Sequence, residues 1–183
     1  MKRINDEKFD LKNHIRSVSG WPEPHVVFRD ICSLLEDRIV FKKLIDLFVH
    51  RYATADIDAV VGIDARGFII GAPLAYELNA GFIPLRKKGK LPGETISEAY
   101  TLEYGQAEIE VQTAWLRKGH KVILVDDLIA TGGTMVAAVK LLKRIGVDIL
   151  EASAIIDLPD LGGSRLIKET GVNVHTFCEF EGE

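Results

Sequence analysis

Two adjacent carboxylates, Asp126 and Asp127, stand between an apolar run and a turn of small residues. The run is Val122 to Val125, and the turn reads Ala130-Thr131-Gly132-Gly133-Thr134. Backbone N–H groups of such a turn, with the unpaired donors of a helix that follows, can bind a phosphate dianion. Two carboxylates would repel a di- or triphosphate, but they accept hydrogen bonds from sugar hydroxyls. The pattern therefore predicts a phosphate in the turn and a ribose diol on the acids. In the plainer alternative, the acids only cap a helix and the glycines only turn the chain.

This chemistry needs a strand that ends at the acids and a helix that begins after the turn. Lys121 to Asp126 predicts a buried parallel strand, and 135–145 predicts a helix that stops at Gly146. Strands alternating with helices along the chain predict an α/β fold, with a mostly parallel twisted sheet flanked by helices. Ligands of such folds lie beyond the carboxyl ends of the strands. The other expected strands are 59–63, 81–85, 149–156 and 172–177, and the other expected helices are 6–18, 41–52, 67–78 and 164–169.

A second loop that could bind an anion follows the strand at 59–63. It reads Asp64-Ala65-Arg66-Gly67 and comes at the start of a helix. A guanidinium beside a helix N-terminus suits a diphosphate. The alternative is a surface arginine that pairs with Asp64. Together the two strand ends fit one ligand that carries a phosphate, a sugar and a diphosphate.

Residues 86–112 differ in composition from the rest of the chain. Arg86 to Lys90 is basic, and Glu103 with Tyr104 follows in an apolar and aromatic setting. Alternation at 107, 109 and 111 predicts an exposed two-stranded flap. A mobile lid of this kind could cover a diphosphate and exclude water. A solvated surface loop is the simpler explanation of the charge run.

Composition bounds the remaining possibilities. The 183 residues are 47% apolar, which predicts one domain with a single core. A net charge of −4 argues against nonspecific nucleic-acid binding. We expect no membrane span, no secretory signal and a reducing cytoplasm. Cys32 and Cys178 lack C-x-x-C spacing, so neither a metal site nor a disulfide framework is indicated. The sequence also contains neither G-x-x-x-x-G-K-[ST] nor G-x-G-x-x-G.

Five motifs that occur in order along the chain indicate a particular protein family. They are V-F-R-D-I (27–31), A-R-G-F (65–68), R-K-K-G-K-L-P-G (86–93), L-E-Y-G (102–105) and V-D-D-L-I-A-T-G-G-T (125–134). Over about residues 21–163, the chain resembles the adenine phosphoribosyltransferases, a family of type I phosphoribosyltransferases. The resemblance implies one domain over 1–183, with a base-binding hood at 1–35 and a flexible lid at 86–112. It also implies purine salvage in the cytoplasm by a homodimer, which makes AMP and diphosphate from adenine and 5-phosphoribosyl 1-diphosphate (PRPP) with Mg²⁺.

The resemblance also assigns roles to residues. The turn Ala130 to Thr134 would hold the 5′-phosphate of PRPP, and the acid pair would hold the ribose hydroxyls. Mg²⁺ would be bound mainly by PRPP oxygens and water, without a protein metal cage. The residues implied for the diphosphate are Arg66, Lys87, Lys90 and Tyr104.

Base recognition is assigned to Val27, Phe28 and Arg29, with the Phe28 ring stacked on adenine and backbone groups reading its edge. Ordinary core packing is the alternative role for Phe28. Glu103 is the candidate general acid/base, although its side chain could instead only orient the base. Two other functions stay open at this point: transfer to hypoxanthine, guanine or xanthine, and a PRPP-sensing regulator that binds nucleic acid.

Overall fold

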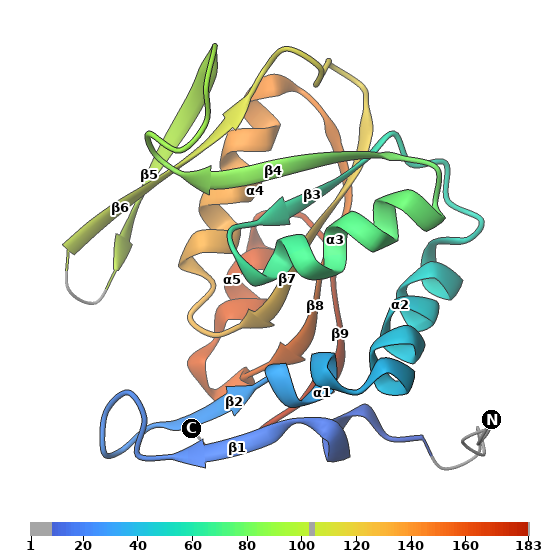
Figure 1. Ribbon diagram of the computed structural model, residues 1–183. Coiled ribbons are helices and arrows are strands. Elements are labelled where there is room, and N and C mark those ends of the chain that lie inside the picture. Colours follow the sequence, from blue (N-terminus) through green and yellow to red (C-terminus); the bar gives the residue numbers. More distant parts are fainter. Residues whose placement is uncertain (1–8, 103–104, 183) are drawn as a thin grey trace.

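A seven-stranded sheet runs through the centre of the computed structural model, which describes residues 9–102 and 105–182 (Figure 1). Its strand order is β5-β6-β4-β3-β7-β8-β9. Strands β4, β3, β7, β8 and β9 are parallel, whereas β6 runs antiparallel to both of its neighbours, β4 and β5. This confirms the expected α/β architecture with a mostly parallel sheet. The strands are β3 (Ala59–Ile63), β4 (Gly81–Lys87), β5 (Thr95–Leu102), β6 (Gly105–Gln112), β7 (Lys121–Ile129), β8 (Asp148–Asp157) and β9 (Val174–Glu179).

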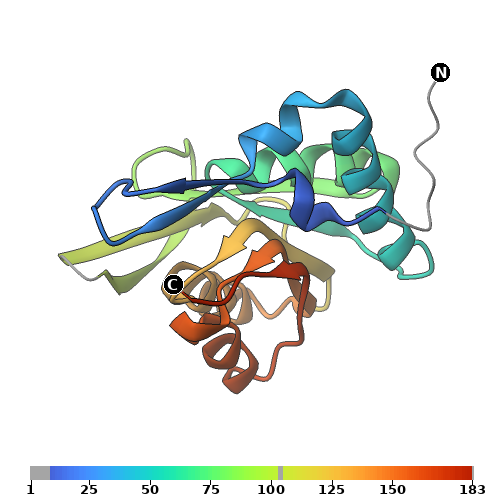
Figure 2. The same ribbon diagram turned by 90° about the horizontal axis from the view of Figure 1, so that it is seen from below.

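Helices cover both faces of this sheet (Figure 2). In β7, Val122 and Leu124 pack into the cluster that contains α4, while Ile123 and Val125 pack into the cluster with α1, α2 and α3. All four side chains are fully buried, which explains why this strand is continuously apolar. The helices are α1 (Cys32–Glu36), α2 (Arg38–Tyr52), α3 (Arg66–Glu77), α4 (Gly133–Ile145) and α5 (Gly163–Glu169), with a 3₁₀ turn, η3, at Pro159–Leu161.

Most predicted elements are found within a few residues of their expected bounds. Gly146 ends α4 in the left-handed conformation, with φ +86°, as its position predicted. Pro73 lies inside α3. Strand β7 extends to Ile129, three residues beyond its expected end at Asp126, so both acids lie within the strand. Among the described residues, no helix has the length and apolar character needed to cross a membrane.

The N-terminal segment differs from its prediction. Within the described part of the expected helix 6–18, a 3₁₀ turn, η2 (Leu11–His14), leads directly into strand β1 (Arg16–Ser19). Strand β1 pairs with β2 (Val27–Asp30) as a separate antiparallel sheet. Leu11 and Ile15 are buried as the helical pattern required, but Val18 is 37% exposed. Pairing with the next strand along the chain therefore overrides the helical spacing of these three residues.

The segment 86–112 also differs from the expected isolated flap. Strands β5 and β6 do form a hairpin, but β6 also pairs with β4 through Arg86 and Lys87. Ile109 and Val111 are buried in the main core. The root of the hairpin is thus an extension of the central sheet. Its tip, with Glu103 and Tyr104, lies outside the described residues.

Candidate active site

The acid pair lies near the carboxyl end of the central strand β7. Asp127 is 5% exposed, and its carboxylate accepts a hydrogen bond from the Arg66 side chain. Asp126 Oδ1 accepts a hydrogen bond from the Asp127 backbone N–H at 2.9 Å. The N-cap of α4 is Gly132, and no described side chain caps that helix. The alternative in which the acids merely cap a helix is therefore wrong.

Electrostatics set the charge of this pair. Burial raises the pKa of Asp126 well above its usual range, and the neighbouring Asp127 carboxylate raises it further. Burial lowers the pKa of the Arg66 guanidinium, but the Asp127 carboxylate more than offsets this, so that its pKa is raised. Because Asp127 is paired with the Arg66 cation, the pair repels a phosphorylated ligand less than two free carboxylates would.

The turn after β7 forms a small polar hollow. Its volume is about 120 Å³, and its walls include Asp126 and the whole turn from Ala130 to Thr134. Gly132 has φ +79°, a conformation that favours glycine, and from there the chain enters α4. The first N–H groups of any helix lack intrahelical acceptors. The hollow therefore has the backbone donors and the helix N-terminus that a phosphate dianion requires.

A glycine from a distant part of the chain supports this turn. The Gly163 N–H donates to the Ala130 carbonyl at 3.1 Å. A Cβ atom on Gly163 would lie 2.2 Å from the Ala130 oxygen and 2.7 Å from the Gly132 nitrogen. Only glycine lets the start of α5 approach the turn this closely. This contact was not predicted from the sequence, although the Gly162-Gly163 pair before a helix was a possible signal for it.

The first residues of α3 contact the acid pair and the strand that carries it. A Cβ atom on Gly67 would lie 2.6 Å from the Val125 carbonyl oxygen, so glycine is needed where α3 meets β7. Arg66 is the first residue of α3 and reaches Asp127. The alternative pairing of Arg66 with Asp64 is wrong. Asp64 instead accepts a hydrogen bond from Arg86 Nε at 2.9 Å, a partner that the sequence did not reveal.

The small N-terminal sheet brings an aromatic side chain to the same place. The Phe28 ring centroid is 6.0 Å from the Arg66 guanidinium carbon and 4.5 Å from the Trp21 ring centroid. Val18, Trp21, Phe28 and Asp30 line an open hollow of about 290 Å³. Phe28 is only partly buried, so it is not a core residue in the ordinary sense. A planar ligand could pack on it.

The two residues flanking Phe28 have different surroundings. The Arg29 side chain turns away from this hollow, donates to Ser17 at 2.7 Å and lies over the Phe180 ring. Val27 is opposite Ser19 in the β1–β2 pair. Recognition of a base by backbone groups at these two positions, which the resemblance implied, stays a prediction.

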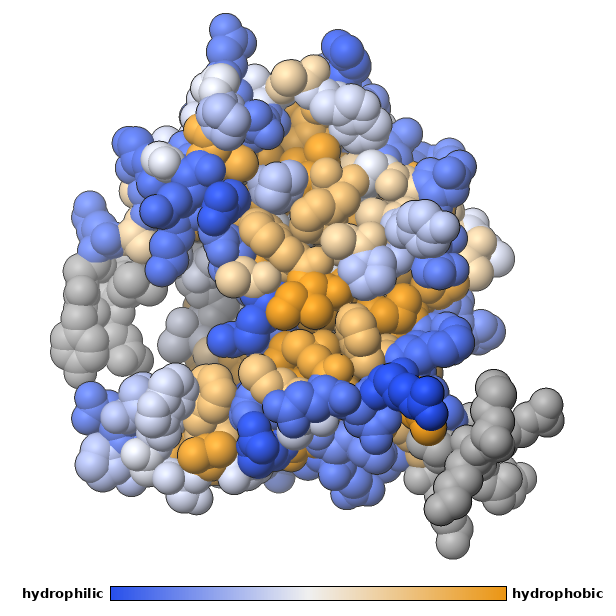
Figure 3. All heavy atoms as spheres, in the orientation of Figure 1, coloured by the Kyte–Doolittle hydropathy of each residue, from blue (hydrophilic) through white to orange (hydrophobic). Residues whose placement is uncertain are grey.

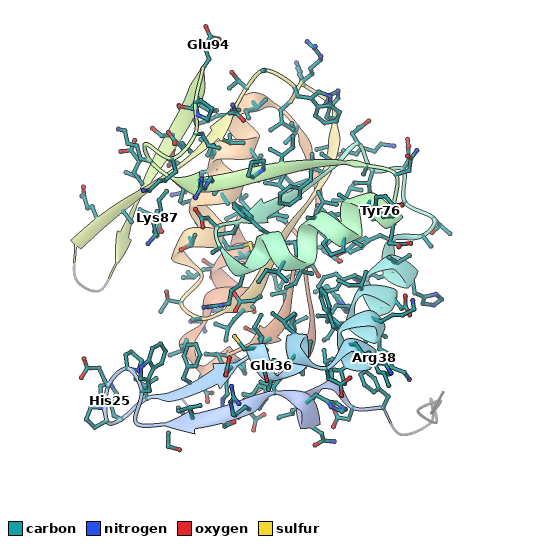
Figure 4. All side chains as sticks on the ribbon, viewed as in Figure 1. His25, Glu36, Arg38, Tyr76, Lys87 and Glu94 are labelled. Carbon is teal, nitrogen blue, oxygen red and sulfur yellow. The ribbon has the colours of Figure 1, made fainter. Side chains whose placement is uncertain are left out.

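The two predicted lysines come from the edge of the site. Lys87 is exposed at the carboxyl end of β4, beside the root of the hairpin (Figure 4). Lys90 is exposed in the turn that follows. Neither ammonium group forms an ion pair with any residue that the structure describes. Both side chains are thus available to an anion.

Taken together, the structure gathers four features around the ends of β3 and β7: the acid pair, the glycine turn, Arg66 and Phe28. They offer acceptors for hydroxyl groups, donors for a phosphate, a cation for a second anion and a flat apolar surface for a ring. Within 9–102 and 105–182, no group of three or more His, Cys, Asp or Glu side chains could hold a metal ion.

The sequence of the chain is similar to that of proteins of known family. The chain matches the phosphoribosyl transferase domain over residues 32–172. It is 59% identical over 173 residues to the adenine phosphoribosyltransferase of Marinobacter nauticus, covering 94% of this chain and 96% of that one.

Solved structures of adenine phosphoribosyltransferases are also similar to the structure of this chain. The Saccharomyces cerevisiae adenine phosphoribosyltransferase complexed with D-2,5-dideoxy-2,5-imino-altritol 1,6-bisphosphate and adenine has a TM-score of 0.86 and 35% identity, covering 92% of this chain and 96% of that chain. The Trypanosoma brucei enzyme in complex with AMP, pyrophosphate and ribose-5-phosphate has a TM-score of 0.84 and 30% identity, covering 92% of this chain and 78% of that chain.

Proposed function

The chain belongs to the phosphoribosyl transferase family, among the adenine phosphoribosyltransferases, and we propose that it transfers the 5-phosphoribosyl group of PRPP to adenine. The products are AMP and diphosphate. The observation that carries this proposal is the meeting of the acid pair, the glycine turn and Arg66 at the carboxyl ends of β3 and β7, with Phe28 6.0 Å from Arg66. Each part of PRPP and of adenine has a matching group within this site.

In the proposed complex, the turn from Ala130 to Thr134 binds the 5′-phosphate through backbone N–H groups. Asp126 and Asp127 accept hydrogen bonds from the ribose hydroxyls. The diphosphate lies on Arg66, Lys87, Lys90 and Tyr104. During transfer, N9 of adenine forms a bond to C1′ of the ribose, and the bond from C1′ to the diphosphate oxygen breaks, with its electron pair leaving on that oxygen. The proton of N9 is lost to a base.

Adenine is proposed to stack on Phe28, with backbone groups of Val27 and Arg29 at its edge. Adenine presents an N6 donor and an N1 acceptor, and hypoxanthine and guanine reverse both. A site built for one pattern leaves buried groups unpaired with the other. Support for adenine comes from the relatives' names and from the adenine in the yeast complex.

Glu103 is proposed to receive or guide the proton of the purine, and the β5–β6 hairpin is proposed to cover the diphosphate. Closure of the hairpin tip would exclude water from an oxocarbenium-like centre at C1′. Since the hairpin root is part of the central sheet, the proposed lid motion is confined to the outer part of 86–112. Ile96 and Tyr100 pack against the main core and mark where that motion would begin.

Mg²⁺ is proposed as the cofactor, bound by PRPP oxygens and water beside Asp126 and Asp127. The donor set fits this, because Mg²⁺ keeps several waters and takes few carboxylates when phosphates are present. When bound, it would neutralise part of the diphosphate charge.

We also propose a cytoplasmic homodimer. Support for the dimer comes from the outward face of α3, where Tyr76 is 83% exposed and Ile69 is 43% exposed (Figure 4). Apolar side chains gather over the centre of this face of the molecule (Figure 3). Residues 67–76 carry no charge, so two copies of this helix could meet without like-charge repulsion. Support for the cytoplasm comes from Cys32 and Cys178, which are both free thiols.

The test of function is to mix the protein with PRPP and Mg²⁺ and to offer adenine, hypoxanthine, guanine and xanthine separately. We expect AMP formation to be much the fastest reaction. Faster formation of IMP, GMP or XMP would refute the adenine assignment. If no base is converted, a gel-shift titration that shows tight, salt-sensitive nucleic-acid binding would favour the regulator.

A further inference from the structure

Glu110 is a buried carboxylate that the reaction as described does not use. It lies on β6 and is 4% exposed, between the buried apolar residues Ile109 and Val111. A charged side chain is rarely buried unless hydrogen bonds satisfy it. Its partners therefore indicate what this position does.

The Glu110 carboxylate binds the backbone of the basic turn. Its Oε1 accepts the N–H groups of Lys90 and Leu91, both at 2.9 Å, and its Oε2 accepts the Thr95 hydroxyl at 3.3 Å. Burial raises the pKa of Glu110, but the hydrogen bonds from the Leu91 and Lys90 backbone outweigh burial, so the pKa is lowered and the group is charged at neutral pH.

Arg86 binds the carbonyl group of Lys90, the residue whose N–H group binds Glu110. It stands opposite Glu110 in the pairing of β4 with β6. Its Nη1 donates to the Lys90 carbonyl at 3.2 Å, and its Nε donates to Asp64 at 2.9 Å. The N–H and the C=O of Lys90 are thus both held by side chains. One of these side chains also binds the loop that presents Arg66.

We propose that Glu110 is a positioning residue for diphosphate binding: with Arg86, it fixes the backbone of Lys90 relative to the Arg66 loop, so that both cations meet one diphosphate. This inference rests on the proposed function. Glu110 itself touches no substrate. The basic turn is then a preorganised half of the diphosphate site, which lowers the ordering entropy that binding must overcome.

A purely structural role would give a different result. If Glu110 only stabilised the hairpin, its loss would lower the unfolding temperature without a selective effect on diphosphate binding. Glu108 provides the matched control. It lies two residues away on the same face of β6, and its carboxylate binds the side chains of Lys88 and Ser97 instead of the turn backbone.

The experiment compares Glu110→Ala, Glu110→Gln and Glu108→Ala with the unaltered protein. Calorimetry measures the dissociation constants of diphosphate and of PRPP, each with Mg²⁺, and initial rates give kcat and the KM for adenine. We expect Glu110→Ala to weaken diphosphate binding about 10-fold, as the loss of one charge-assisted hydrogen bond would. The KM for adenine should be unchanged. Glu110→Gln keeps an oxygen for the two N–H groups and should restore most of the affinity, and Glu108→Ala should bind as the unaltered protein does.

A double-mutant cycle identifies the route of the effect. In a Lys90→Ala background, Glu110→Ala should cause little further loss, because both changes remove the same cation from the ligand. Fully additive losses would overturn the proposal, and so would unchanged diphosphate affinity in folded Glu110→Ala. Should Glu110→Ala not fold, Glu110→Asp, which keeps the charge but is too short to reach the turn, serves in its place. The binding readout is independent of turnover, so absence of AMP formation by the unaltered protein would refute the proposed function alone.

Discussion

Replacing Gly163 by alanine would place a methyl carbon 2.2 Å from the Ala130 carbonyl oxygen and 2.7 Å from the Gly132 nitrogen. Both atoms belong to the backbone of the proposed phosphate-binding turn, which cannot rotate away as a side chain could. To reach an ordinary contact of 3.4 Å, the two segments must move apart by 3.4 − 2.2 = 1.2 Å. Overpacking of this kind destabilises a protein by about 1–3 kcal/mol. A displacement of about 1 Å at a site that positions a substrate can lower the rate by about 100-fold.

We therefore expect Gly163→Ala to lower kcat/KM for PRPP by about 10- to 100-fold, through its KM above all, and to lower the unfolding temperature by about 2–12 °C. Initial rates at varied PRPP and thermal unfolding measure the two effects. Ser164→Ala is the control, since it changes the next residue of α5 and removes a hydroxyl that has no hydrogen-bond partner in the described part of the chain. A folded Gly163→Ala protein with the normal KM for PRPP would show that α5 moves away while the turn keeps its conformation. That result would refute the reasoning.

Four further outcomes are expected. Glu103→Ala, outside the described residues, should lower kcat by about 10²- to 10⁴-fold and raise the KM for PRPP far less; near-normal turnover would remove Glu103 from the chemistry. Asp127→Asn should weaken PRPP binding in calorimetry by about 10-fold, the effect of one lost charge-assisted hydrogen bond, and an unchanged dissociation constant would count against the ribose assignment. Phe28→Ala should raise the KM for adenine by about 5- to 10-fold, as loss of a stacking contact would, and leave the KM for PRPP unchanged; the reverse pattern would place the base elsewhere. Asp126→Asn tests the raised pKa of Asp126: the native state holds this proton more tightly than the unfolded state, so stability falls as the pH rises from the usual value of 3.8 towards the raised pKa. The variant lacks this loss, so its advantage in denaturant unfolding should grow over that pH range, and parallel curves would contradict the assignment.

The central strand and its turn could be predicted from the sequence because their signals are local. A run of four apolar residues is typical of a strand that is buried on both faces in the interior of a sheet, and Gly146 marks the end of α4. The acid pair was expected at the carboxyl end of this strand, where ligands of such folds lie, and it is found near that end. The apolar run could not give the last residue of β7, because Asp127, Leu128 and Ile129 continue the strand past the acid at which it was expected to end.

The N-terminal strand could not be predicted in this way. Leu11, Ile15 and Val18 have the spacing of one helical face, and two of them are buried as a helix would bury them. The chain leaves the helical path because β1 finds a partner in β2, with Arg16 opposite Asp30 in that pairing and joined to it by an ion pair. That pairing links residues 14 positions apart and leaves no local trace.

The same limit explains which site residues were found and which were missed. The acid pair, Asp126 and Asp127, lies close in sequence to the turn from 130 to 134, so the sequence alone indicates that they could bind one ligand. The Arg66–Asp127 pair spans 61 positions, and the contact of Gly163 with the turn spans about half that distance. A glycine needed for close approach looks in sequence like any glycine in a turn, and an arginine shows its charge but not its partner.

The Arg66–Asp127 pair also bears on why an acid pair can serve a site for a highly charged ligand. A diphosphate brought to Arg66 competes with Asp127 for the same guanidinium, and Asp127 then needs another hydrogen-bond donor. In the proposed complex the ribose hydroxyls are such donors. They replace the hydrogen bond that Asp127 loses when Arg66 turns to the diphosphate. A ligand with a diphosphate but no sugar would leave a buried carboxylate unpaired. In the proposed complex, the arrangement would therefore favour the intact phosphorylated sugar over free diphosphate.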